Sequence, residues 1–229
     1  MTSTHPEIHG DCDPRFQAVR DALANNFATH DELGSAVTVY HEGQKVVDLW
    51  GGHMDAARSK PWREDTLCIM YSIAKSICAT SVHILADRGL VDLEAPVADY
   101  WPEFAQNGKE GVLVRHIISH NCGVCFADAT EAGDVYNYDR MIAALEVQAP
   151  AWPAGSRGAY NTVNIGFLAG EVVRRVTGTP IPQFVQENIC GPLGVDYQIG
   201  VREEDLDRVA DLQPNPAGSA MAAQAAAGE

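Results

Sequence analysis

Basic residues are scarce in this chain of 229 residues, where 16 Lys and Arg stand against 31 Asp and Glu and leave a formal net charge of −15. Nucleic acids and anionic membranes bind clustered Lys and Arg side chains, and the sequence contains no basic run. Long apolar runs are also missing, because no stretch approaches the ~18 consecutive apolar residues that span a bilayer. We therefore expect neither a nucleic acid nor a membrane as a partner.

Signals for export and for bound cofactors are missing as well. The first residues lack the basic segment and apolar run of a secretion signal, which predicts a cytoplasmic protein. The six cysteines are even in number, but the chain is too long and too rich in core residues to need a disulfide framework, so we expect reduced thiols. A P-loop, a dinucleotide fingerprint and a G-x-S-x-G elbow are all absent, and we expect no cofactor. Apolar residues, by contrast, make up 46% of the chain, enough for a substantial core.

The spacing of these apolar residues predicts one hairpin and several helices. Two β-rich runs around a short Gly-containing turn indicate an antiparallel hairpin at about 35–50. Asp13-Pro14 is typical of an N-cap followed by proline at the first helical position, and apolar residues at helical spacing follow it. A helix is predicted over 72–88, and another begins at Asn164, which we expect to be its N-cap.

Ser72 and Lys75 are the first candidates for chemistry. Three residues apart at the start of a predicted helix, the hydroxyl and the amine project from one face within reach of each other. The serine also lies where a helix has unpaired N–H groups and the positive end of its dipole, which stabilise an oxyanion. Tyr160, on a Gly-rich loop before a predicted buried helix, is a candidate base or hydrogen-bonding relay. Taken alone, these residues also fit a helix-starting serine, a surface lysine and a packing tyrosine.

Ordered motifs surround these candidates from Gly10 to about Pro214. They are found at 12–16 (CDPRF), 47–52 (VDLWGG), 72–75 (SIAK), 85–97 (LADRGLVDLEAPV), 100–104 (YWPEF), 114–120 (VRHIISH), 170–178 (GEVVRRVTG) and 191–196 (GPLGVD). Together they resemble the serine β-lactamase-related hydrolases and, more narrowly, the class-C-like carboxylesterases called family VIII. The resemblance implies Ser72 as the nucleophile, Lys75 as its partner and Tyr160 as the catalytic tyrosine.

The resemblance also implies a fold and a reaction. The fold is α+β, of the β-lactamase/penicillin-binding-protein type, with an antiparallel-sheet α/β lobe and a helical lobe. One such domain is expected over 1–214, with the sheet hairpin near 35–50 and the helical lobe near 90–200, followed by a low-complexity tail over 215–229. The implied reaction has two steps: a small-molecule ester or amide acylates the serine, and water then releases the acyl group.

Two departures from the family pattern refine this expectation. Tyr160-Asn161-Thr162 has threonine where class C β-lactamases have asparagine, which favours an esterase or a related hydrolase. The family's third motif, on a strand that lines the site, has no counterpart before Glu229. We therefore expect the front part of a larger hydrolase with an incomplete sheet. A peptidase, an amidase and an acyltransferase of the same family remain alternatives.

A rival hypothesis comes from four metal-binding residue types within ten positions, His116, His120, Cys122 and Cys125. A cysteine pair with two residues between can hold zinc, and two histidines four apart on one helix can share a metal ion. The alternative function is then a non-catalytic or zinc-stabilised binding module on the same fold. Structural roles for both histidines and burial of the cysteines are favoured over a metal site, so we assign no metal ligands.

Overall fold

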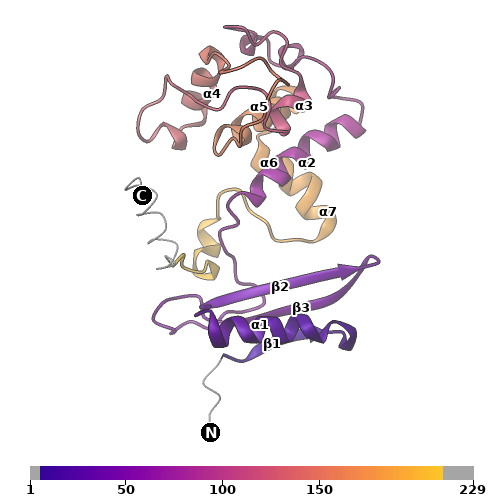
Figure 1. Cartoon of the computed structure of the whole chain (residues 1–229), viewed down its shortest axis with the longest axis vertical. Coiled ribbons are helices and arrows are strands. Elements are labelled where there is room, and N and C mark those ends of the chain that lie inside the picture. Colours follow the sequence, from indigo (N-terminus) through magenta and orange to yellow (C-terminus); the bar gives the residue numbers. More distant parts are fainter. Residues whose placement is uncertain (1–5, 214–229) are drawn as a thin grey trace. The chain divides into compact units, whose positions relative to one another are not determined.

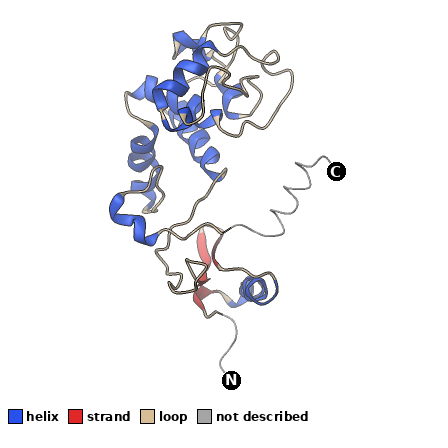
Figure 2. Cartoon of the chain, turned by 90° about the vertical axis from the view of Figure 1, so that its left-hand side faces the viewer, coloured by secondary structure: helices blue, strands red, loops and turns tan. Residues whose placement is uncertain are grey.

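The computed structural model describes residues 6–213, which fall into two units. The sheet unit comprises the described residues up to Ile69 together with those from Val201 onward, and the helical unit is Met70–Gly200. All three strands of the described residues belong to the sheet unit (Figures 1 and 2). The tail expected over 215–229 lies outside the described residues.

The sheet unit contains an antiparallel sheet with the strand order β1-β3-β2. Its strands are β1 (Ile8–Cys12), β2 (Gly34–His41) and β3 (Gln44–Gly52). The predicted hairpin is confirmed: β2 and β3 pair across Glu42 and Gly43, whose φ angles of 50° and 75° suit the two-residue turns that match strand twist. Strand β1 was not predicted, because its short sequence alternates too weakly and its order comes from pairing with β3.

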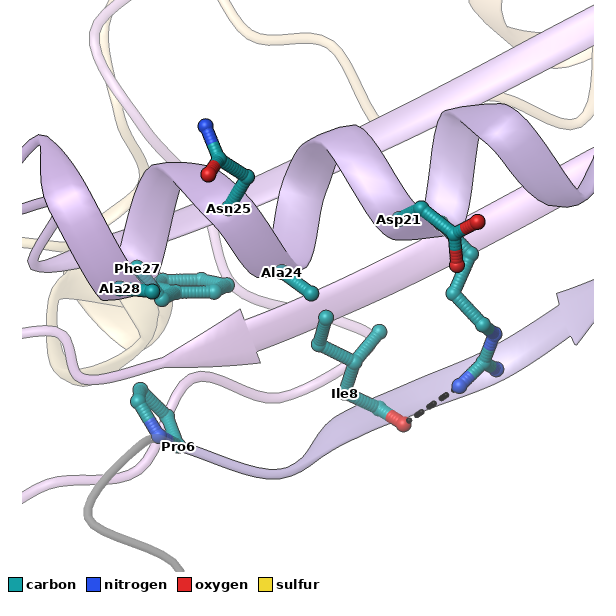
Figure 3. Close-up of a pocket in the computed structure, with 8 residues that line it drawn as sticks. Pro6, Ile8, Asp21, Ala24, Asn25, Phe27 and Ala28 are labelled. Carbon is teal, nitrogen blue, oxygen red and sulfur yellow. Dashed lines mark hydrogen bonds between the residues drawn. The ribbon is translucent and has the colours of Figure 1, made fainter.

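Helix α1 (Gln17–Thr29) lies along the sheet (Figure 1). The Asp13 side chain accepts from the backbone N–H of Arg15, as expected of a cap, but Pro14–Phe16 form a separate 3₁₀ turn before α1 begins. Leu23 and Phe27 pack with Val46, Val47 and Leu49 of β3. From the same helix, Arg20 donates to the carbonyl oxygens of Ile8 at 3.2 Å and Gly10 at 2.8 Å, which ties β1 to α1. Ile8 of β1 lies beside Ala24 of α1 (Figure 3).

The helical unit is organised around α5, which contacts four other helices (Figure 1). Trp101, Phe104, Leu145 and Leu168 are fully buried in its core, and burying a side chain of this kind contributes about 1.5–3 kcal/mol. The helices are α2 (Ile73–Asp87), α3 (Val114–Ile118), α4 (Tyr138–Val147), α5 (Asn164–Thr177), α6 (Ile181–Val185) and α7 (Gly191–Leu193). No helix within residues 6–213 is both long enough and apolar enough to cross a membrane.

The start of α5 differs from its prediction. Asn164 is the first helical residue and not the N-cap, and its side-chain amide donates to the Phe126 carbonyl at 2.9 Å. The N-cap is Val163, which makes no side-chain capping bond, and the Asn164 backbone N–H donates instead to the Asn161 Oδ1 at 2.9 Å. The prediction was wrong because the Asn164 side chain is used in a tertiary contact, so the first N–H of the helix is bonded by a residue three positions earlier in the chain.

Candidate active site

Ser72 lies at the N-terminal end of α2, immediately after a sharp turn. Tyr71 has a φ of 44°, in the left-handed region that side chains rarely adopt. The backbone N–H groups of Ile73 and Ala74 donate to Met70 and Tyr71, so the chain turns tightly before the regular helix begins. The turn leaves the Ser72 side chain exposed.

Lys75 and Tyr160 meet Ser72 although Tyr160 is far away in the sequence. The Lys75 Nζ donates to the Ser72 Oγ at 3.1 Å and lies 5.1 Å from the centroid of the Tyr160 ring. Hydrogen bonding from Ser72 lowers the pKa of the Tyr160 phenol, and hydrogen bonding and charge from Lys75 lower it further. The structure therefore brings all three predicted residues into one cluster, with a hydroxyl, an amine and an acidified phenol side by side.

Buried amides hold the loop that carries Tyr160. The Asn161 side chain is 2% exposed, and its Nδ2 donates to the Val124 carbonyl at 2.9 Å. Its Oδ1 accepts from Asn164, so one side chain fixes both the loop and the start of α5. Because Asn161 follows Tyr160 directly, these bonds fix the backbone from which the phenol projects.

His120 is a site neighbour that sequence reasoning did not assign to this cluster. Its ring lies 4.8 Å from the Tyr160 ring, centroid to centroid, and its Nδ1 accepts from the Asn161 backbone N–H at 2.9 Å. His120 lies in the same motif as His116, and this spacing suggests a shared metal ion. It gives no sign of a contact with a tyrosine 40 residues away.

The zinc hypothesis finds no cluster in the structure. Helix α3 ends at Ile118 and His120 has a φ of 63°, so the two histidines do not lie on one helix as the rival zinc hypothesis requires. The Nδ1 of His116 accepts from the Leu113 backbone N–H, and burial raises the pKa of the Cys122 thiol to about 11, which disfavours a metal-binding thiolate. Over residues 6–213, no three His, Cys, Asp or Glu side chains are grouped to hold a metal ion.

Comparisons with known proteins identify the family of this chain. The beta-lactamase family model matches residues 19–228. Esterase/beta-lactamase LipL of Mycobacterium tuberculosis is 37% identical over 189 residues, which are 82% of this chain and 44% of LipL. The crystal structure of a family VIII carboxylesterase is 46% identical, with a TM-score of 0.87 over 91% of this chain and 58% of that one.

A penicillin-binding protein homologue from Caulobacter crescentus is similar to the same extent, with 41% identity and a TM-score of 0.88 over 92% of this chain and 57% of that one. This chain therefore spans about half the length of these three relatives. The predicted fold class is confirmed by the structural neighbours and by the small antiparallel sheet beside helices. By sequence and by fold, the chain belongs to the beta-lactamase family.

Proposed function

We propose that this chain carries the nucleophile and the proton-transfer groups of a serine hydrolase that cleaves carboxylic esters. The observation that carries the proposal is the 3.1 Å hydrogen bond from the Lys75 Nζ to the Ser72 Oγ, beside the acidified phenol of Tyr160. A serine is a weak nucleophile until an adjacent group takes its proton, and both partners of Ser72 are proton-transfer groups. The names of LipL and of the family VIII carboxylesterase support an ester as the substrate.

In the first step, the Ser72 Oγ attacks the ester carbonyl carbon and transfers its proton to the Lys75–Tyr160 pair. The bond between the carbonyl carbon and the leaving oxygen then breaks, and the departing alcohol takes that proton. This leaves the acyl group on the Ser72 Oγ. Because its pKa is lowered, the Tyr160 phenol loses its proton more readily than an ordinary tyrosine does. We therefore assign the role of proton acceptor to its phenolate.

In the second step, water attacks the acyl carbon and gives its proton to the same pair. The bond from the carbon to the Ser72 Oγ breaks, the serine regains a proton and the carboxylic acid leaves. An alcohol in place of water would make the same site an acyltransferase, so the two activities differ only in the second acceptor.

The start of α2 supplies electrostatic help for both steps. Helix α2 is 15 residues long, and its first N–H groups and dipole favour negative charge at the Ser72 end. We assign the Ser72 backbone N–H as one donor to the carbonyl oxygen as it becomes negative. Removing one donor of this type costs about 3–4 kcal/mol of transition-state stabilisation.

The test is covalent labelling of the purified chain by a fluorophosphonate, together with hydrolysis of a short-chain nitrophenyl ester. We expect the label on Ser72 by peptide mapping, and we expect Ser72→Ala to abolish labelling and hydrolysis. Ser76→Ala is the matched control, because Ser76 is an exposed serine one turn further along the same helix. Labelling or hydrolysis that persists in Ser72→Ala would refute the proposal.

A further inference from the structure

His120 contacts the residues before and after Tyr160 in the chain, and it also contacts the Tyr160 ring. The Ala159 backbone N–H donates to the His120 carbonyl oxygen at 3.0 Å, and the Asn161 backbone N–H donates to the His120 Nδ1 at 2.9 Å. Between these two bonds, the Tyr160 ring lies against the imidazole with a centroid distance of 4.8 Å and an angle of 35° between the ring planes. One residue therefore holds three consecutive positions of the loop.

The backbone conformation of His120 makes these three contacts possible. Its φ of 63° is in the left-handed region, where histidine and asparagine occur more often than most residues. In this conformation, the carbonyl oxygen and the ring of His120 can both accept hydrogen bonds from the same segment of the loop.

The hydrogen bond to Nδ1 also fixes the protonation state of the ring. A nitrogen that accepts a hydrogen bond carries no proton, so the ring is neutral with its hydrogen on Nε2. If Nδ1 were protonated, two N–H groups would face each other and the bond from Asn161 would be lost. The hydrogen bond from the loop to the ring therefore exists only while the imidazole is neutral.

We propose that His120 is a positioning residue for Tyr160: while neutral, it holds the phenol against Ser72 and Lys75, and protonation of its ring releases the loop and slows acylation. This inference rests on the proposed function, because it assigns His120 a role in the reaction of Ser72. His120 is not a catalytic residue in this scheme, since it acts through Tyr160.

The groups around His120 keep it neutral near pH 7. Burial lowers the pKa of His120 below the usual value of about 6.5, and the positive charge of Lys75 lowers it further. Lys75 faces the ring from α2, and Tyr160 faces it from the loop before α5. The Cys125 Sγ lies 3.9 Å from the Ala159 carbonyl oxygen, and burial raises the pKa of its thiol, which is therefore uncharged near pH 7. The loss of activity should thus occur on the acid side of pH 6.5.

The first experiment measures the rate of Ser72 labelling by a fluorophosphonate against pH in two variants. His120→Phe keeps an aromatic ring but offers no acceptor to Asn161, and we expect labelling about 10- to 100-fold slower, as misplaced reacting groups typically cause. His120→Asn retains an acceptor oxygen and tolerates the left-handed φ but does not titrate. We expect it to label faster than His120→Phe and to lack the acid limb, which is the additional fall in labelling rate below about pH 6.5 that we expect of the unmodified chain beyond the fall caused by Tyr160.

His116→Asn is the matched control. Its Nδ1 also accepts a backbone N–H, from Leu113, and burial also lowers the pKa of His116, yet no contact joins it to Tyr160 in the described residues. We expect this variant to keep the labelling rate and the acid limb. Circular dichroism verifies that each variant folds. If His120→Phe does not fold, His120→Asn by itself still tests the acid limb.

A second readout does not depend on labelling. The ultraviolet titration of the Tyr160 phenol, taken as the difference from Tyr160→Phe, should shift in His120→Phe and not in His116→Asn. If Ser72 of the unmodified chain is not labelled, the proposed function fails, whereas the titration still decides whether His120 holds Tyr160. The inference is overturned if His120→Phe labels and titrates like His116→Asn, or if the acid limb persists unchanged in His120→Asn.

Discussion

Replacing Glu171 by Gln should destabilise the helical unit by about 3 kcal/mol, a loss typical of breaking a buried ion pair. The Glu171 side chain is fully buried in α5. Its carboxylate accepts from Arg174 at 2.7 and 2.5 Å, from the Arg175 Nε at 2.6 Å and from the Tyr138 hydroxyl at 3.1 Å. Gln has nearly the same shape, so the substitution removes the charge and one acceptor without opening a cavity.

The partial exposure of the two arginines places this loss near the lower end of the range for buried pairs, which is about 3–5 kcal/mol. The side chains of Arg174 and Arg175 are 39% and 26% exposed, so water can hydrate the charges that Glu171 no longer neutralises. The matched control is Glu94→Gln, whose carboxylate pairs with Arg115 at 2.9 Å but is 67% exposed. Exposed pairs contribute about 0–1 kcal/mol, so the control should change little.

Native-state hydrogen exchange of the α5 amides is the assay, because it reports opening of the helical unit by itself. A loss of about 3 kcal/mol corresponds to exchange that is roughly 100-fold faster. Burial raises the pKa of Glu171, but the hydrogen bonds from Arg174 and Arg175 outweigh burial and lower it overall.

The stabilisation by Glu171 is therefore present above the unfolded pKa of about 4.3 and is lost as the pH falls through the lower folded value. The difference between Glu171→Gln and the unmodified chain should shrink below that pH. The reasoning is refuted if α5 exchanges at the same rate in Glu171→Gln and in Glu94→Gln at pH 7.

Four further predictions concern the site and the packing around it. Lys75→Met and Tyr160→Phe should each slow fluorophosphonate labelling of Ser72 by about 10²- to 10⁴-fold, the contribution typical of a proton-transfer group. Because the pKa of Tyr160 is lowered, the labelling rate of the unmodified chain should rise with pH through a value below about 10, and Tyr160→Phe should lose that rise. Lys109→Met should destabilise the helical unit by about 3 kcal/mol, because the buried ammonium donates to three backbone carbonyls that would lose their partner. Thermal denaturation followed by circular dichroism checks this. Gly123→Ala should cost about 2 kcal/mol or more in the same assay, because φ is 79° and a Cβ would lie 2.4 Å from the Trp152 carbonyl oxygen; an unchanged melting temperature would contradict the expected strain.

The family and the local elements could be predicted because they depend on short-range patterns. Ser72 and Lys75 are neighbours on any helix that starts at Ser72, so their spacing alone predicts the contact that the structure shows. The hairpin follows in the same way from two β-rich runs and a Glu42-Gly43 turn, and its pairing is confirmed. Strand β1 escaped prediction because a strand of five residues is stabilised by its partner and not by its own sequence.

The sequence by itself determined which residues are candidates for the reaction, through motifs that place a serine, a lysine and a tyrosine in an order that resembles a known family. Only the tertiary structure decided which of their neighbours hold them. The Asn164 side chain bonds a distant carbonyl and does not cap α5, and His120 lies against Tyr160 and not beside His116 on a helix, because each choice depends on where a distant loop comes to lie. A side chain with several possible hydrogen-bond partners takes the one that folding brings within about 3 Å, and sequence spacing does not encode that distance.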